Sequence, residues 1–238
     1  MAILKSDSGD ISYTLTRRKG MKNMRIRIKD DGSVCVSANP NVPLAKIENF
    51  IQKNSQWIVR SVGEKNSAAD RSIENGTKLK IFGEILTVEL RQDGDEDAVC
   101  DGERLIVTAS DIANQAHVRQ LLIGFIALRG RTVLSRHYRF FLERCGYMGQ
   151  PPMLVLKALK SKWGHCDYKN NQIMLNFALC GLPEELAAYV AAHEVAHLLV
   201  RNHSSDFYKV GESIYPGFNE YNRLLKQYNT NLWANIIA

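Results

Sequence analysis

The chain has 238 residues, 45% of them hydrophobic and 24% charged, and its formal net charge at pH 7 is +6. No apolar run approaches the roughly 18 residues of a membrane-spanning helix, and the N-terminus lacks the apolar core of a secretory signal. These properties exclude a helical membrane protein and lead us to expect a soluble, cytoplasmic, globular protein. The positive charge permits an acidic partner such as a nucleic acid or a nucleotide but does not require one.

The first part of the chain is rich in β-strand patterns. Short runs with alternating apolar positions and β-branched residues predict strands over 11–17, 24–29 and 33–38. Asp31-Gly32, between the last two runs, predicts a hairpin turn. A helix is then expected to begin at Pro43, because apolar residues follow it at helical spacing. These apolar residues are Leu44, Ile47, Ile51 and Ile58, with Trp57 beside them.

Three further strands and a long helix follow. The strands are expected over 78–83, 85–90 and 104–109. The acidic segment 92–103 between them predicts a turn-rich loop. From Ser110, a suitable N-cap, the apolar period becomes helical, and Gly146 is expected to stop this helix after Cys145.

The remainder of the chain combines strands with a second helical pattern. Strands are expected over 153–160 and 172–179, with a loop over 161–171 between them. Pro183, followed by two acidic residues, predicts the start of a helix.

These elements predict an α+β fold class with two regions. The first is a β-rich N-terminal region over 1–109 that contains one helix. The second, over 110–238, is an α+β domain that carries the candidate catalytic residues. No internal repeat is visible in the sequence. The five cysteines are odd in number and lack C-x-x-C spacing, which argues against a disulfide framework and against a zinc ribbon.

The segment 191–207, AAHEVAHLLVRNHSSDF, holds three of the six histidines. His193 and His197 lie four residues apart on a predicted helix, a rotation of about 400° that places both imidazoles on one face. Glu194 points about 100° away around the axis, where it can take a proton from water at a metal. The alternative is a helix with structural histidines. Burying these polar side chains on an apolar helix is costly unless a metal satisfies them, so H-E-x-x-H predicts a metal site.

A catalytic zinc site needs a third protein ligand and an open position. His203 can supply the ligand if the helix ends before it. Asn202 tolerates the left-handed conformation that ends helices, and Ser204 or Ser205 can cap the next helix. One Zn²⁺ per chain is expected, although three histidines also suit other divalent ions. The alternative third ligands are Asp206, Glu212 and Glu220.

Three segments of the chain together resemble a known family. They are S-K-W-G-H-C, the strand Q-I-M-L-N-F, and H-E-V-A-H-L-L-V-R-N-H-S-S-D-F. They resemble the YgjP-like metallopeptidases, a zincin family related to SprT-like proteins. The resemblance is close from about Lys160 to Phe207 and weaker in the N-terminal hairpins and helix. The sequence departs from the family pattern at His165, where serine is usual, and at Lys162, where arginine is frequent.

The resemblance implies a fold, a cofactor and a reaction. It implies a zincin-like fold, one zinc ion and hydrolysis of a peptide or protein. It further implies that Glu194 is the base and that the strand over 172–179 forms an edge that binds extended peptide, although this strand can also be a simple core strand. The zinc ligands that it implies are His193, His197 and His203.

Two other features have more than one interpretation. His165 can lean over the cleft and stabilise a developing oxyanion, or it can lie exposed while Trp163 packs in the core. The basic run 17–29 can face nucleic acid, although such runs are more often the solvated face of a strand.

The sequence supports three functional hypotheses. The favoured one is a zinc-dependent hydrolase, a metallopeptidase. The second is a metal-dependent nucleoside triphosphate pyrophosphohydrolase, since the same activated water can attack a phosphoryl group. The third is a nucleic-acid-associated binding module with a structural metal. The sequence carries no signal for the oligomeric state.

Overall fold

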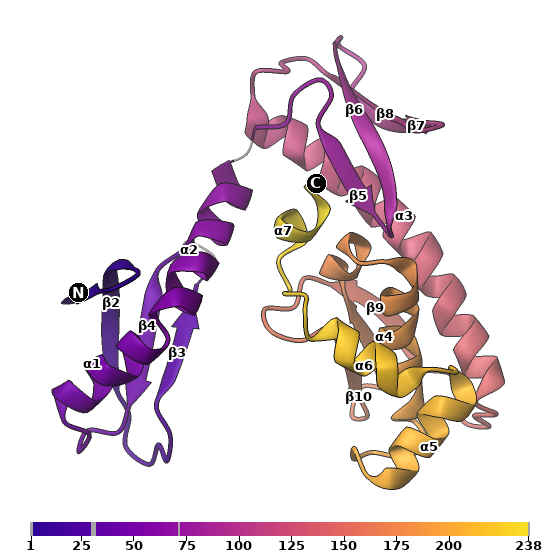
Figure 1. Ribbon diagram of the computed structural model, residues 1–238. Helices are drawn as coiled ribbons and strands as arrows, with labels where there is room; N and C mark the ends of the chain where they lie inside the picture. Colours follow the sequence, from indigo (N-terminus) through magenta and orange to yellow (C-terminus); the bar gives the residue numbers. More distant parts are fainter. Residues whose placement is uncertain (1, 30–31, 71, 238) are drawn as a thin grey trace. The chain divides into compact units, whose positions relative to one another are not determined.

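The computed structural model describes residues 2–29, 32–70 and 72–237 (Figure 1). The backbone contacts group the chain into two compact units, an N-terminal unit, Met1–Arg71, and a C-terminal unit, Ser72–Ala238. Among the described residues, no helix has both the length and the apolar character that a membrane crossing requires.

The N-terminal unit is a four-stranded sheet with two helices on one face. The strand order across the sheet is β1-β2-β4-β3. The buried apolar side chains of β2 and β4 occupy alternate positions, and they pack against Ile47, Ile51 and Ile58 of the helices. The elements are β1 (Ala2–Ser6), β2 (Gly9–Arg17), β3 (Arg25–Ile28), β4 (Val34–Ala38), α1 (Leu44–Lys53) and α2 (Ser55–Asp70).

The predicted hairpin turn in this unit lies partly outside the described residues, and the predicted helix is divided into two. Asp31 of the expected Asp31-Gly32 turn lies outside the described residues, but Gly32 has a φ of 75°, which suits glycine in a hairpin turn. The helix expected from Pro43 is interrupted at Asn54, so it forms α1 and α2. The Asn54 side chain donates to a backbone carbonyl of the preceding turn at 2.7 Å, an alternative to continued helical pairing.

The C-terminal unit begins with a second four-stranded sheet, in the order β5-β6-β8-β7. β7 falls inside the segment 92–103, so the prediction of a loop there is wrong. β7 is an edge strand paired with β8, and because most of its side chains are exposed it lacks the apolar alternation that identifies a strand. The strands are β5 (Lys78–Ile81), β6 (Glu84–Gln92), β7 (Asp97–Asp101) and β8 (Arg104–Ala109).

This second sheet repeats the topology of the first. In each sheet the second strand pairs antiparallel with the first strand along its N-terminal half and parallel with the fourth along its C-terminal half. β2 changes partner at Tyr13, and β6 changes partner at Thr87. The third strand pairs antiparallel with the fourth, and a helix follows. The repeat is invisible in the sequence because strand order depends on pairing and burial, which many residue combinations satisfy.

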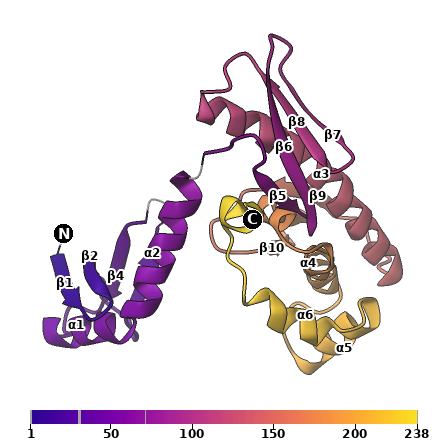
Figure 2. The same ribbon diagram turned by 45° about the horizontal axis from the view of Figure 1, so that its top comes forward.

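The long helix α3 (Gln115–Arg144) connects this sheet to the helices of the candidate site (Figure 2). It packs against β7 and β8 and also against α4 (Glu184–Ala196). Its N-cap is Asn114, whose side chain accepts from the His117 N–H at 3.2 Å. The prediction of Ser110 as N-cap is wrong, because the Ser110 hydroxyl instead donates to Glu96 at 2.7 Å.

A three-stranded sheet packs against α4, in the order β10-β11-β9. Two predictions are corrected here. β10 forms inside the segment 161–171 that the sequence predicts as a loop, and the strand predicted over 172–179 ends at Asn176, where a 3-10 helix, Phe177–Gly181, begins. The remaining elements are β9 (Met153–Lys157), β10 (Gly164–Asp167), β11 (Gln172–Asn176), α5 (Ser205–Ile214), α6 (Phe218–Leu225) and α7 (Leu232–Ile236).

The strand order shows which strands of this sheet are edge strands and which strand is central. β11 pairs antiparallel with β10 and parallel with β9, so it is central. The expectation that this strand forms a peptide-binding edge is therefore wrong. The edge strand that packs against α4 is β10.

The contact boundary between the units precedes the predicted domain boundary. The contacts place the boundary between residues 71 and 72, whereas the sequence predicts it between residues 109 and 110. β5–β8 share one buried core with α3 and α4, to which Leu79, Leu105 and Val195 all belong. A catalytic domain that begins at residue 110 stays a prediction.

Candidate metal centre

α4 presents two histidines on one side, one helical turn apart. The helix is deeply buried, with every residue from Leu186 to Ala192 below one tenth exposed. His193 lies in its last turn and His197 is its C-cap, and their ring centroids are 4.9 Å apart. A helix of 13 residues is marginal in isolation, so the packing that surrounds α4 stabilises it and holds the two imidazoles in place.

His203 joins this pair because the helix ends before it. The helix ends at Ala196, earlier than the predicted end at Asn202, and α5 starts at Ser205 with Ser204 as N-cap. The His203 ring centroid lies 5.0 Å from that of His193 and 4.8 Å from that of His197.

Three ring nitrogens of these histidines converge in a way that fits a divalent metal. One ligand atom from each of His193, His197 and His203 lies within 4.8 Å of the others, and this is the one such cluster among the described residues. The alternative ligand Asp206 pairs with Lys209 instead. Three imidazoles without a carboxylate match the donor set of catalytic zinc sites, which leaves a fourth position for water or substrate.

The surroundings of the histidines fix their ring orientations. The Nδ1 of His197 lies 3.1 Å from the Val200 carbonyl, which can only accept, so Nδ1 carries the proton and Nε2 is the free ligand atom. The His193 Nδ1 lies 3.2 Å from the Tyr189 hydroxyl. Phe207, which is fully buried, packs its ring 4.5 to 4.9 Å from all three imidazoles.

Burial keeps the two helical histidines neutral. It lowers the pKa of His193 to about 3, with a smaller contribution from the neighbouring His197 and His203. It also lowers the pKa of His197. A neutral imidazole has a free lone pair, so both side chains are ready to bind a cation at neutral pH.

Glu194 extends from α4 to β10, beside the metal cluster. The residue is 6% exposed, and burial raises the pKa of its carboxyl group to about 8. A hydrogen bond with the Cys166 backbone and the charge of Lys162 oppose this rise. The side chain packs so closely on Gly164 that a Cβ there would lie 2.5 Å from its Oε1.

The predicted site residues line one cleft with a volume of about 310 Å³. His165 lines it from β10 and is exposed, while Trp163 is half-buried against the core. Cys166 is buried and its pKa is raised to about 11, which makes its thiol a poor nucleophile at neutral pH. The residues that line the cleft are Lys162, Gly164, His165, Cys166, Tyr168, His193, Glu194, His197, Arg201 and His203.

Sequence reasoning missed Asn176, which positions the loop that precedes β10. Asn176 is 1% exposed, and its side-chain amide donates to the Leu159 carbonyl at 2.9 Å and to the Lys162 carbonyl at 2.7 Å. Its backbone N–H donates to the Trp163 carbonyl at 2.8 Å. An asparagine that ends a strand is ordinary in sequence, so these contacts could be found only in the folded chain.

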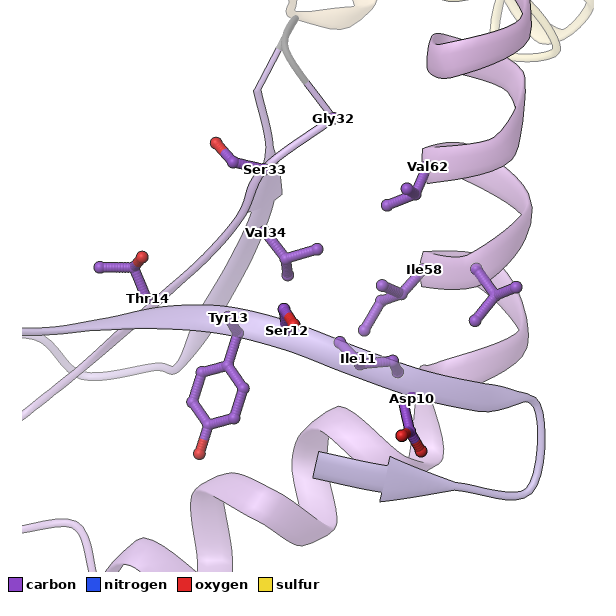
Figure 3. A pocket seen from close by; sticks show the side chains of 11 residues that line it. Asp10, Ile11, Ser12, Tyr13, Thr14, Gly32, Ser33, Val34, Ile58 and Val62 are labelled. Atoms are coloured by element: carbon purple, nitrogen blue, oxygen red, sulfur yellow. The ribbon is translucent and has the colours of Figure 1, made fainter. Parts of the chain in front are cut away.

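A larger cavity of about 440 Å³ lies inside the N-terminal unit (Figure 3). Figure 3 shows Ile58 and Val62 of α2 directed toward Val34 and Ile11 of the sheet. Among the residues that the structure describes, Asp10 is the one charged side chain in its lining. It contains none of the predicted site residues, so size alone does not identify the site, and the smaller cleft holds the candidate chemistry.

Gly164→Ala is expected to lower turnover at least ~10-fold with little loss of metal, because the new methyl group would displace the Glu194 carboxylate from its position. Hydrolysis rates and metal content of the purified variant test this. Gly124→Ala is the matched control, since a Cβ at Gly124 in α3 meets nothing within 4 Å. Equal activity of both variants would contradict the role of the Gly164–Glu194 contact.

Without metal, the wild type is expected to lose stability relative to the Glu194→Gln variant as the pH rises from about 5 to 8. The folded chain raises the pKa of Glu194 from 4.5 to about 8, so its contribution to stability is complete below 4.5 and is lost as the pH approaches 8. At pH 8 the metal-free Glu194→Gln variant should be more stable by on the order of 4 kcal/mol. Urea denaturation in a chelator measures this difference, and parallel pH profiles for the two proteins would refute it.

Comparisons with known proteins identify the family. A family model described as YgjP-like, metallopeptidase domain, matches residues 22–228. A search of curated proteins found no match. Among solved structures, the chain is similar to the metallopeptidase zymogen of Pyrococcus abyssi abylysin, with 27% identity over 40% of this chain and 93% of that chain and a TM-score of 0.36. Because the family model spans most of the sequence, the chain belongs to the YgjP-like metallopeptidase family.

Proposed function

We propose that the chain is a zinc-dependent peptidase in which His193, His197 and His203 hold the metal and Glu194 is the general base. The observation that carries the proposal is the convergence of three imidazole nitrogens beside a buried carboxylate in one cleft. Membership of a metallopeptidase family supports a divalent metal and a peptide or protein substrate.

Glu194 moves the proton in the proposed reaction. When bound, zinc supplies Lewis acidity that polarises the scissile carbonyl and acidifies water. Glu194 takes a proton from the attacking water and delivers it to the leaving amine. Its contacts with Gly164 and the Cys166 backbone hold the carboxylate in place, which lowers the reorganisation that the reaction requires. His165 lines the same cleft, where it can donate a hydrogen bond to the developing oxyanion.

β10 is the strand that we assign to peptide binding. It is an edge strand, it packs against α4, and it carries Gly164, His165 and Cys166 into the cleft. An extended peptide can add to such an edge through backbone hydrogen bonds, with alternate side chains directed into the cleft.

The substrate distinguishes the peptidase proposal from the hypothesis of a nucleoside triphosphate pyrophosphohydrolase. Zinc-loaded protein should cleave casein or a peptide library and leave nucleoside triphosphates intact, and a chelator should abolish cleavage. Release of pyrophosphate without peptide cleavage would replace the peptidase proposal with the nucleotide hydrolase.

The nucleic-acid hypothesis has one observation in its favour. Residues 72–238 hold equal numbers of acidic and basic side chains, so the net charge of +6 resides in the N-terminal unit. Part of the basic run is used internally, because Arg17 donates to the Asn39, Pro40 and Val42 carbonyls. Salt-dependent DNA binding without peptide hydrolysis would favour this hypothesis.

A further inference from the structure

The cleft is cationic although the unit that contains it has no net charge. Lys162 and Arg201 both line it, and the one carboxylate that the described part of the chain contributes to its lining is the buried Glu194. Among the described residues, no carboxylate forms an ion pair with either cation. The positive charge is therefore local to the cleft rather than a general property of the C-terminal unit.

Arg201 is held in place by an aromatic side chain. Its guanidinium carbon lies 4.7 Å from the centroid of the Tyr168 ring. The Tyr168 hydroxyl in turn donates to the His197 carbonyl at 2.9 Å, which ties the ring to the end of α4. A guanidinium has five N–H donors, and the contact of its carbon with the ring does not use all of them, so donors remain for a carboxylate.

We propose that Arg201, assisted by Lys162, makes the cleft select substrates that carry a carboxylate close to the bond that is cleaved. The inference rests on the proposed peptidase function and names its substrate class. A planar fork of donors matches a carboxylate in a bidentate arrangement, and a second cation in the cleft adds attraction at longer range. The carboxylate can belong to an acidic side chain or to the C-terminus of the peptide.

The test compares peptides that differ by one group. Blocked hexapeptides with a single Glu, Gln or Lys at each position in turn, and one alanine hexapeptide with a free or an amidated C-terminus, are mixed with zinc-loaded wild type, and products are counted by mass spectrometry. We expect kcat/KM to be at least ~10-fold higher for the Glu peptides or for the free C-terminus, which also distinguishes the two sources of the carboxylate. Equal rates for all the peptides would overturn the inference.

Charge reversal gives the sharper result. Arg201→Glu should invert the preference, so that Lys peptides are cleaved faster than Glu peptides, and Arg201→Lys should keep a weaker preference for Glu. Arg223→Glu, the same charge change at an exposed position of α6, should leave the preference unchanged. Ratios within one preparation do not depend on the active fraction, so a partly folded variant still gives an answer. An unchanged ratio in Arg201→Glu would overturn the role of Arg201.

A binding measurement separates this inference from the proposed function. Zinc-loaded Glu194→Gln protein is dialysed against the same peptides, and the retained fraction of each is measured. Selective retention of carboxylate peptides supports the inference even if the wild type cleaves none of them, in which case the peptidase proposal fails alone. Equal retained fractions for peptides with and without a carboxylate would overturn the inference.

Discussion

Glu194→Gln is expected to lower peptide hydrolysis by ~1,000-fold or more while the metal content stays at that of the wild type. A positioned general base contributes about 10²- to 10⁴-fold, and an amide cannot take the proton of the attacking water. Glutamine has nearly the shape of glutamate, so it should keep the packing on Gly164. Glu194 lies outside the converging cluster of histidines, so its loss should not remove a ligand. Steady-state hydrolysis and elemental analysis of one preparation measure both quantities.

The matched control for this variant is Glu185→Gln. Glu185 lies on the same helix, but its side chain is exposed, and its backbone carbonyl accepts a hydrogen bond from the Tyr215 hydroxyl that the substitution leaves in place. This variant should retain activity. Wild-type turnover in Glu194→Gln, or loss of its metal, would remove Glu194 from the role of base.

His203→Ala is expected to weaken zinc binding by at least ~100-fold. Removing even a hydrogen-bond partner behind a metal ligand typically costs about 10- to 100-fold in affinity, and removing a ligand should cost more. Zinc should also cease to raise the melting temperature of the variant, because a ligand stabilises the folded state only as far as it binds. Competition with a chromophoric chelator and thermal unfolding with and without zinc measure these effects.

His165→Ala tests a residue that lines the cleft but is not a predicted metal ligand. His165 lines the same cleft but does not belong to the converging cluster. This variant should bind zinc with wild-type affinity, and its hydrolysis rate reports the proposed contact with the oxyanion. If His203→Ala binds zinc as tightly as the wild type, the third ligand must come from elsewhere in the chain.

The parts of the site that follow from local geometry could be predicted from the sequence. The spacing of His193 and His197 places them on one helical face wherever the helix lies. His203 required one more assumption, a helix end, and the structure provides that end at Ala196. The α+β class followed in the same way from the periods of the apolar residues.

The missed features depend on contacts between distant segments. β7 and β10 are short and lack a regular alternation of apolar residues. They are identified as strands only by their pairing with β8 and β11. The contact of the Arg201 guanidinium with the Tyr168 ring joins a turn after α4 to the β10–β11 hairpin, and no spacing in the sequence indicates that they meet. The repeated sheet topology is likewise a property of strand pairing and not of residue identity.

The central claim is that this cleft hydrolyses peptide bonds with a bound metal. The direct measurement is mass spectrometry of a proteome-derived peptide library after incubation with zinc-loaded wild type, chelator-treated wild type and zinc-loaded Glu194→Gln. The account predicts new peptide termini in the first sample and their absence from the other two. New termini at the same rate in all three samples, or in none of them, would contradict it.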